Sequence, residues 1–427
     1  MLTGPTTRPS SQLRRDLRAM LGDGVSFSVM LGVGESYLPA FALALGYGDV
    51  TAGLVATIPM LAGALLQLAS PAAVGMLDSH RRWIVLCAAL QALCFAPLVV
   101  SALAHQMDLV LLFAVASLYW GLGMSTGPAW TTWASSLVPQ RLRPAFFANR
   151  ARASQLALVL ALVGGGMILQ LGKGQGVEFE AYALIFTLAL AARGVSASFL
   201  SSQREPRTLE VGDTSISPAV IRKHVRTGGH GRLLLFLLTF QAGVMVASPY
   251  FTPYMLAELE LSYLQYTVLS ATAFGSRVLA LPFLGRYVRR VGTKRVLWRA
   301  GLAISTFPIL WLITDHFAWL LFLQVISGVG WAAFELASLL SFFERIPPQG
   351  QTSVLTLYNL ANATAVVTGS AIGGLLLRGF GEGSTGFVAI FTVSTLARAA
   401  MLLFLRRVPE LENPGNPPPI RALSVRP

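Results

Sequence analysis

Twelve long apolar runs restrict this sequence to one kind of fold. A helix needs about 20 mostly apolar residues to cross the hydrocarbon core of a membrane, and runs of that length follow one another along nearly the whole chain of 427 residues. The composition agrees, because 54% of the residues are hydrophobic and 12% are charged, whereas about a quarter are charged in a typical soluble domain. We therefore predict an all-α integral membrane protein with twelve transmembrane helices. Their predicted bounds are 22–46, 50–76, 83–104, 109–133, 152–171, 181–201, 233–256, 264–284, 296–314, 317–343, 352–377 and 385–405.

The basic residues predict the orientation of these helices. Connections on one side of the membrane carry 27 of the 32 Lys and Arg residues, while the other connections hold only Lys173 and Arg378. Loops rich in Lys and Arg stay in the cytoplasm, so twelve crossings place both termini there. We expect a multi-pass protein of the plasma membrane, with the bacterial inner membrane as its location. Because the net charge of +13 follows this topology, we expect no nucleic-acid partner.

Internal repetition divides the twelve helices into two sixes. The segment "WGLG" (120–123) is repeated as "SGVG" (327–330), 207 residues later, and "GGG" (164–166) has a counterpart in "GG" (373–374) at nearly the same offset. One offset that recurs along the chain indicates a duplicated unit. The predicted organisation is a cytoplasmic segment (1–21), an N-terminal six-helix bundle (22–201), a cytoplasmic linker (202–232), a C-terminal six-helix bundle (233–406) and a cytoplasmic tail (407–427).

Two short basic loops carry a family resemblance. The segment "GRYVRRVGTKR" (285–295) resembles the major facilitator superfamily signature G-x-x-x-D-R-x-G-x-K-R, and "GMLDSHRR" (75–82) resembles a shortened copy of it. The resemblance implies the fold of that superfamily, with two pseudo-symmetric six-helix bundles over the whole chain, and it implies a transporter. The second copy departs from the signature because Arg289 stands where the family has Asp.

We interpret these loops as candidate gating elements. A glycine permits a tight reversal between helices, Asp78 can accept hydrogen bonds from a helix N-terminus, and the arginines can bond helix C-terminal carbonyls or lipid phosphates. Asp78 is the better candidate for a latch, and the alternative is a set of basic anchors at the membrane face. The candidate residues are Gly75, Asp78, Arg81, Arg82, Gly285, Arg289, Arg290, Gly292, Lys294 and Arg295.

Five charged residues lie away from the ends of the predicted spans, namely Glu35, Arg193, Arg277, Glu335 and Arg398. A charge at the centre of a membrane helix costs about 2.5 to 3.5 kcal/mol on insertion scales, so each needs an explanation. Arg193 and Arg398 occupy matching places in the two halves. We interpret them as snorkelling side chains or as packing inherited with the repeat.

Glu35 is our first candidate for proton coupling. Its helical neighbours Ser28, Gly32, Pro39 and Ala42 form a stripe of small or polar residues, which indicates a face turned to protein or water and not to lipid. The family resemblance implies that helices 1, 4, 7 and 10 surround a central cavity, so Glu35 would border it. Desolvation favours the protonated form of a carboxylate, and protonation then removes a buried charge.

Glu335 is the second candidate for proton coupling, because it lies in the tenth predicted helix beside small and polar residues. Arg277 in the eighth helix would lie nearer the contact between the halves. The alternatives are a structural ion pair of Glu335 with Arg277, or a carboxylate that accepts hydrogen bonds from Ser or from the backbone.

Aromatic and amide side chains are the remaining candidates for the cavity wall. Such a wall suits an amphiphilic or modestly cationic organic substrate, while those residues near span ends could instead form an interfacial aromatic belt. The candidates for cavity or substrate contact are Arg277, Gln241, Tyr250, Tyr254, Trp331, Tyr119, Trp120, Asn359 and Asn362.

The sequence contains no motif of an enzyme. A Walker A loop, HExxH and GxSxG are all absent, so we predict neither a catalytic residue, nor a cofactor, nor a metal site. We predict a monomeric secondary active transporter that moves a small organic molecule by alternating access, coupled to protons and embedded among membrane lipids. Ser117 stands where proton-coupled drug exporters of the superfamily carry Arg, which leaves the direction of transport open. The alternatives are a lipid- or lysolipid-handling member of the superfamily and a facilitator without ion coupling.

Overall fold

The computed structural model describes residues 10–139, 142–205, 229–345, 351–381 and 383–405. Within these ranges the chain is helical and forms no strand. The helices of the first half are α1 (Ser10–Val33), α2 (Leu38–Ala44), α3 (Asp49–Val55), α4 (Ile58–Gln67), α5 (Ser70–Leu77), α6 (His80–Leu93), α7 (Phe95–Leu103), α8 (Leu109–Leu137), α9 (Arg143–Gln175) and α10 (Glu178–Ser202). Those of the second half are α12 (Gly229–Met245), α13 (Phe251–Pro253), α14 (Tyr263–Val291), α15 (Thr293–Leu310), α16 (Phe317–Arg345), α17 (Gln351–Phe380) and α18 (Ser384–Leu405).

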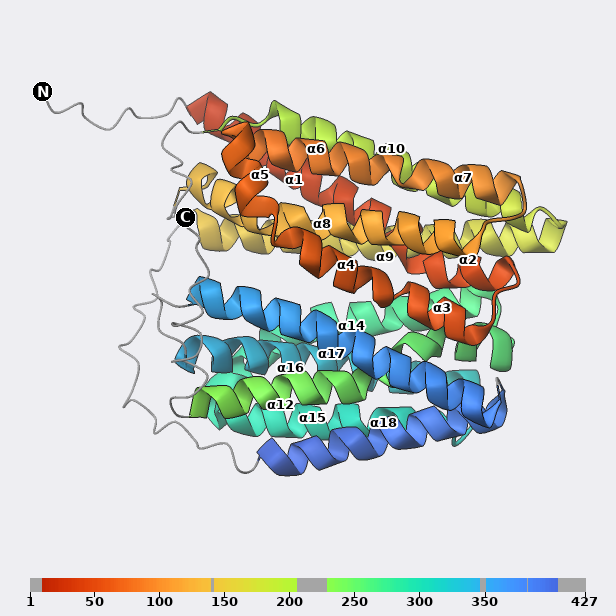
Figure 1. The fold of residues 1–427 in the computed structure, drawn as a ribbon. Helices are drawn as coiled ribbons and strands as arrows, with labels where there is room; N and C mark the ends of the chain where they lie inside the picture. Colours follow the sequence, from red (N-terminus) through yellow and green to blue (C-terminus); the bar gives the residue numbers. More distant parts are fainter. Residues whose placement is uncertain (1–9, 140–141, 206–228, 346–350, 382, 406–427) are drawn as a thin grey trace, which may run out of the picture.

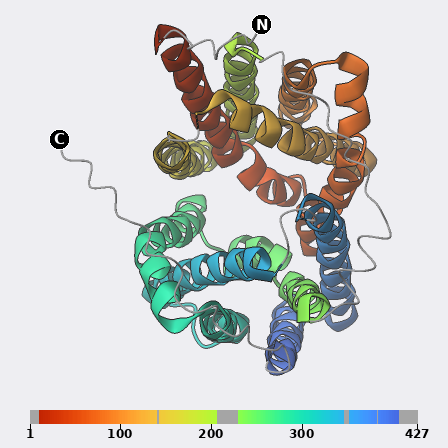
Figure 2. The same ribbon diagram turned by 90° about the vertical axis from the view of Figure 1, so that its left-hand side faces the viewer.

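The helices form two bundles that lie side by side with their long axes in a common direction (Figure 1). α1 to α10 make the first bundle and α12 to α18 the second, as the view along the helices also shows (Figure 2). We call the side where α1 begins and α18 ends the terminal side, and the opposite side the far side. The predicted all-α membrane fold with two bundles is confirmed.

Eleven helical stretches among the described residues are long and apolar enough to cross a membrane. α15, which packs against α16 in the second bundle, is not among these eleven and corresponds to the predicted ninth span. α15 has 18 residues and begins with the charged segment "TKRVLWR". These charges lower the mean hydropathy of the helix.

Several helices extend beyond the predicted apolar spans. α1 begins at Ser10 and α9 at Arg143, whereas the predicted spans begin at 22 and 152. The added turns are rich in Arg, Leu and Ala, which are good helix formers, so the helix continues past the apolar run. The boundaries of the predicted linker and tails stay predictions, because most of these residues lie outside the described ranges.

The first helix of each bundle is broken at an equivalent place. α1 ends at Val33, and a 3-10 turn, η1 (Glu35–Tyr37), precedes α2. α12 ends at Met245, and the 3-10 turn η2 (Ser248–Tyr250) precedes α13 and a π-helical turn, η3 (Tyr254–Glu258). Pro39 and Pro249 follow these breaks or lie in them, and a proline lacks the N–H that would continue the helical hydrogen bonds.

Candidate functional site

Glu35 lies in the break of α1. Its Oε2 accepts a hydrogen bond from the Tyr119 hydroxyl of α8 at 2.7 Å. Tyr119 is only 3% exposed, and Glu35 itself is half-buried. No Lys, Arg or His of the described chain lies within ion-pair distance of this carboxylate. The charge of Glu35 therefore has one neutral hydrogen-bond donor and no cation to compensate it.

A second carboxylate on the same helix, Asp23, was missed by the sequence analysis. Its Oδ2 accepts from Arg150 Nη2 at 3.1 Å, and its Oδ1 accepts from the Ser196 hydroxyl at 2.8 Å. Arg193 donates from Nη1 to Ser196 at 2.7 Å and from Nε to Gln91 at 2.8 Å. This buried polar network joins α1, α6, α9 and α10. The sequence signal was an acid one residue inside the first predicted span, far from any predicted partner.

The buried arginines correct the expectation of snorkelling. Arg193 and Arg398 are each 2% exposed, and both are bonded inside their bundles. Arg398 donates to the Ile304 carbonyl at 2.9 Å and to the Val244 carbonyl at 3.1 Å, while its Nε has no partner among the described residues. The two arginines lie at matching places in the two halves, and among the described residues Asp23 lies in the network of Arg193 whereas Arg398 bonds only backbone carbonyls.

Arg277 and Glu335 form an ion pair between α14 and α16. Their side chains are 36% and 45% exposed, so the pair lies at the surface of the second bundle. This geometry is the ion pair considered as the alternative for Glu335. The two candidate carboxylates thus differ, because Glu335 has a cationic partner and Glu35 has none. Among the described residues, no three His, Cys, Asp or Glu side chains come together in a way that could hold a metal ion.

Tyr37, in the break of α1, connects the two bundles. The side chain is fully buried, and its hydroxyl donates to the Leu162 carbonyl of α9 at 2.6 Å. The same oxygen lies 2.9 Å from Thr267 Oγ1 of α14, so the Thr267 hydroxyl donates to it. A Cβ at Gly165 would lie 2.7 Å from the Tyr37 ring, and one at Gly166 would lie 2.0 Å from Thr267 Oγ1. Two glycines therefore admit this contact between the bundles.

Tyr250, in the break of α12, makes the equivalent contact. It is fully buried, and its hydroxyl donates to the Ser370 carbonyl of α17 at 2.6 Å. A Cβ at Gly373 would lie 2.6 Å from the Tyr250 ring, and a Cβ at Gly53 of α3, in the other bundle, would lie 2.4 Å from it. Glycines again provide the space for a tyrosine between the bundles.

The two tyrosines are related by the internal repeat. Leu162 and Ser370, which accept their hydrogen bonds, are 208 residues apart, as are Gly165 and Gly373. Thr57 of α3–α4 donates to the Ser370 hydroxyl at 2.8 Å, just as Thr267 contacts Tyr37. We call this pair of contacts the tyrosine seam, consisting of Tyr37, Thr267, Gly165, Gly166, Tyr250, Thr57, Ser370, Gly373, Gly374 and Gly53.

The tyrosine seam lies toward the far side of the molecule, where Figure 1 shows α2 and α3 beside the second bundle. Tyr263 of α14 adds to the contacts there, since its hydroxyl donates to Glu178 of α10 at 2.5 Å and lies 2.9 Å from the Tyr182 hydroxyl. The bonds of Thr267 to Tyr37, of Thr57 to Ser370 and of Tyr263 to Glu178 and Tyr182 join segments of one bundle to segments of the other. The described conformation is therefore closed on the far side.

Other predicted cavity residues take different positions. Tyr254 packs against Trp311, Phe387 and Phe391, and its hydroxyl lies 3.5 Å from the Trp311 carbonyl. This places the Tyr254 ring in the core of the second bundle and not on the cavity wall proposed for it, because η3 turns it toward α15 and α18. The residues Gln241, Trp120, Trp331 and Asn362 are partly buried, and the side chain of Asn359 lies outside the described residues.

The first gating loop is held by a residue that the sequence analysis did not identify. The Glu205 carboxylate accepts from Ser79 Oγ, from the His80 backbone N–H at 2.6 Å and from the Arg81 backbone N–H at 3.2 Å. Asp78, predicted for this role, instead ends α5 in the left-handed region with φ +46° and has an exposed side chain. A carboxylate at the start of α6 stabilises the helix N-terminus, and Glu205 reaches it because α10 ends beside it.

The predicted glycine turns are also shifted along the chain. Gly75 lies within α5 and Gly285 within α14, so neither makes the reversal. In the second loop the reversal occurs at Gly292, where φ is +92°, a conformation that favours glycine. Among the other gating candidates, Arg82, Arg290 and Arg295 are exposed, Arg81 and Lys294 are partly buried, and the side chain of Arg289 lies outside the described residues.

Comparison with known proteins identifies this architecture. The sequence profile of the Major Facilitator Superfamily matches residues 233–427, and none of the curated proteins matches the chain. A crystal structure of a mutant of the nucleoside transporter NupG is 13% identical, with a TM-score of 0.71 over 93% of this chain and 100% of that chain. An auto-inhibited POT family peptide transporter is 13% identical, with a TM-score of 0.70 over 94% of this chain and 99% of that chain. A bacterial homolog of the human lysosomal transporter Spinster, in an inward-facing and occupied conformation, is 15% identical. Its TM-score is 0.63 over 95% of this chain and 96% of that chain.

Proposed function

We propose that the chain is a secondary transporter of the Major Facilitator Superfamily, which the match of residues 233–427 and the fold of its structural neighbours support. It would carry a small organic molecule across the membrane by alternating access, with Glu35 as the residue that couples transport to protons. The observation that carries this proposal is a carboxylate with no cationic partner in a broken transmembrane helix. Broken helices at corresponding places in two repeats are typical of transporter binding sites.

The position of Glu35 connects its charge to the closure of the far side. Glu35, Ser36 and Tyr37 form the single turn η1. Glu35 bonds α8 through Tyr119, whereas the Ser36 carbonyl accepts from Tyr266 of α14 at 3.3 Å and Tyr37 bonds α9 and α14. A proton on Glu35 would remove a charge that has no cationic partner from this turn. It would therefore change the stability of the element that holds the tyrosine seam.

The orientation and the substrate class are part of the same proposal. The excess of Lys and Arg in the terminal-side connections supports a cytoplasmic location for that side, so the seam would close the path to the outside. Around Glu35, the ring of Tyr119 packs against Phe95 and Trp120, which favours an amphiphilic or modestly cationic substrate. Nucleosides and peptides are included in the test because the structural neighbours include a nucleoside transporter and a peptide transporter.

Reconstitution into liposomes tests the proposal. Purified full-length protein is assayed with labelled uridine, dialanine and tetraphenylphosphonium, with and without a pH gradient. We expect the gradient to drive accumulation of one of these probes, and Glu35→Gln to abolish the gradient-driven part while substrate exchange at equal pH persists. Glu260→Gln, which changes an exposed far-side carboxylate, is the matched control. Gradient-driven accumulation that survives in Glu35→Gln would favour an uncoupled facilitator or another coupling residue.

A further inference from the structure

Two adjoining hollows lie between α1 and α10 on the terminal side. The first has a volume of about 580 Å³ and is lined by Arg14, Arg15, Arg18 and Phe199. The second has a volume of about 550 Å³ and adds Arg81 and Arg204. They share Ser11, Arg15 and Ser202, so they form one continuous surface, which we call the arginine hollow.

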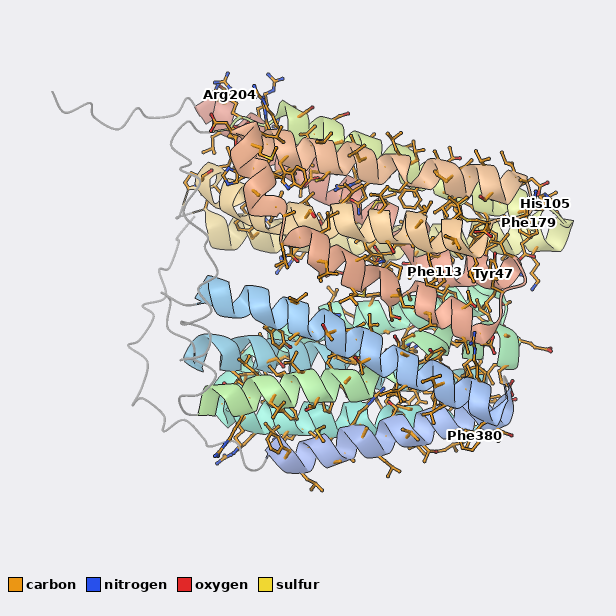
Figure 3. The ribbon with its side chains drawn as sticks, in the orientation of Figure 1. Tyr47, His105, Phe113, Phe179, Arg204 and Phe380 are labelled. Atoms are coloured by element: carbon orange, nitrogen blue, oxygen red, sulfur yellow. The ribbon has the colours of Figure 1, made fainter. Side chains whose placement is uncertain are left out.

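The arginine hollow carries a large excess of positive charge. Arg14, Arg15, Arg18 and Arg204 are exposed, and none of them pairs with an acid of the described chain. Figure 3 shows Arg204 at the terminal end of the molecule. Asp16 is the one acid in the lining of either hollow; it is buried, and its carboxylate accepts from the Arg204 backbone N–H at 3.3 Å. Guanidinium groups left without carboxylates favour a phosphate ligand, which they can bind with two parallel hydrogen bonds.

An apolar surface continues from the arginine hollow into the membrane-spanning part of the bundle. Phe199 lies against α1 because position 22 is a glycine, where a Cβ would come within 2.7 Å of the ring. Val195, Leu188 and Leu184 of α10 follow Phe199 along the helix, and all three are exposed. Spacings of four, seven and four residues from Phe199 onward place them on one helix face. A ligand with its phosphates among the arginines could thus lay acyl chains along α10.

We propose that the arginine hollow binds the headgroup of an anionic phospholipid, with a diphosphate lipid such as cardiolipin fitting its two compartments. Basic pockets between transmembrane helices are suited to such headgroups. A free phosphate or pyrophosphate shares the headgroup chemistry, but it would leave the apolar face of α10 unused. The proposal rests on neither the transported substrate nor proton coupling.

Native mass spectrometry of the delipidated full-length protein in detergent tests this proposal. The probes are tetraoleoyl cardiolipin, dioleoylphosphatidylcholine and pyrophosphate. We expect wild-type protein to bind cardiolipin, and the triple variant Arg14→Gln, Arg15→Gln, Arg18→Gln to bind it about tenfold or more weakly. The charge-matched control replaces three exposed arginines outside the hollow by Gln and should bind as wild type does: Arg152, Arg232 and Arg286.

Three results would overturn the lipid site. Equal losses in the two triple variants would indicate general surface electrostatics, and equal binding of cardiolipin and phosphatidylcholine would remove the role of the headgroup. Pyrophosphate binding of the same strength as cardiolipin, lost in the same variant, would instead assign a soluble phosphate ligand. If the triple variant does not fold, Arg15→Gln alone removes the arginine that both hollows share, and it should weaken cardiolipin binding about fivefold.

Discussion

At the scale of single residues, two carboxylates on one helix have opposite surroundings. Asp23 and Glu35 are twelve residues apart, or about 18 Å along a helix. Asp23 is 4% exposed and lies in a network that contains Arg150 and Arg193. Glu35 has only the Tyr119 hydroxyl. A paired buried charge stabilises one arrangement of helices, whereas an unpaired one favours a change of protonation.

Replacing Asp23 should therefore destabilise the fold. Asp23→Asn preserves the shape of the side chain but leaves Arg150 and Arg193 without a carboxylate, and the loss of one partner from a buried ion pair costs about 3 kcal/mol or more in free energy of unfolding. Denaturation of the purified protein in detergent, followed by circular dichroism, measures the change. Glu180→Gln, an exposed far-side carboxylate, should shift the same free energy by less than about 0.5 kcal/mol. Similar values for the two variants would contradict a stabilising role of the network.

The Tyr119 hydroxyl should set the pH at which transport is coupled. It donates to the ionised carboxylate of Glu35 and so stabilises the charged form. Tyr119→Phe removes this donor, and the carboxylate should hold its proton to higher pH. A hydrogen bond to a charged group is worth about 1.5 kcal/mol, so the pH of half-maximal gradient-driven transport should rise by about one unit. A midpoint that stays in place or falls would contradict this assignment.

At the scale of elements, the breaks in α1 and α12 place two tyrosines between the bundles. Each break ends an α-helix and turns one tyrosine hydroxyl onto a carbonyl of the fifth or the eleventh crossing. Each tyrosine ring rests on paired glycines, which the duplication places 208 residues apart. The far-side contact therefore has two equivalent parts, one contributed by each half.

Removing either seam hydroxyl should loosen the far side to a similar degree. Tyr37→Phe deletes the hydrogen bond to Thr267 between the bundles, and Tyr250→Phe deletes the bond to Ser370 that holds its ring between them. A neutral hydrogen bond is worth about 1 kcal/mol, so far-side opening should become about fivefold more frequent in each variant. The rate at which a membrane-impermeant maleimide labels a cysteine introduced at Ser36 reports this opening. Tyr254→Phe is the matched control, because its hydroxyl faces Trp311 inside the second bundle. Faster labelling in all three variants, or in none, would argue against a gate at the seam.

At the scale of the whole molecule, two bundles meet through close backbone approach on the far side. Gly166 of the first bundle lies against Thr267 of the second, where a Cβ would come within 2.0 Å of Oγ1. Such a distance cannot be accommodated unless the bundles move apart or Thr267 turns away. The relative position of the bundles is thus sensitive to one methyl group.

Gly166→Ala should accordingly favour an arrangement that is open on the far side. Spin labels can be placed at the exposed positions Gln175 and Glu260, one in each bundle. Double electron–electron resonance should then report a longer distance between the labels in Gly166→Ala than in the wild-type protein. Gly164→Ala is the control on the same helix, since a Cβ there meets nothing within 4 Å. Equal distance distributions for the two variants would show that the seam glycines do not hold the bundles together.

The membrane-spanning helical architecture and the resemblance to a transporter family could be predicted from the sequence alone. These properties are local or periodic: an apolar run of about 20 residues spans a membrane whatever its neighbours are, and a repeat is visible as an offset. The isolation of Glu35 in an apolar run also made it a candidate, although the sequence could not show whether a cation lies beside it. The structural neighbours and the family match confirm the fold that the basic loop at 285–295 indicated.

The contacts between polar groups, in contrast, depend on how the helices pack. Asp23 finds Arg150 across 127 residues, Glu205 finds His80 across 125, and Tyr37 finds Thr267 across 230. No sequence pattern predicts these pairs, because each pair depends on which helix faces come into contact when the helices pack. The charge that remains without a cation, Glu35, could be recognised as such only after the partners of the other buried charges were known.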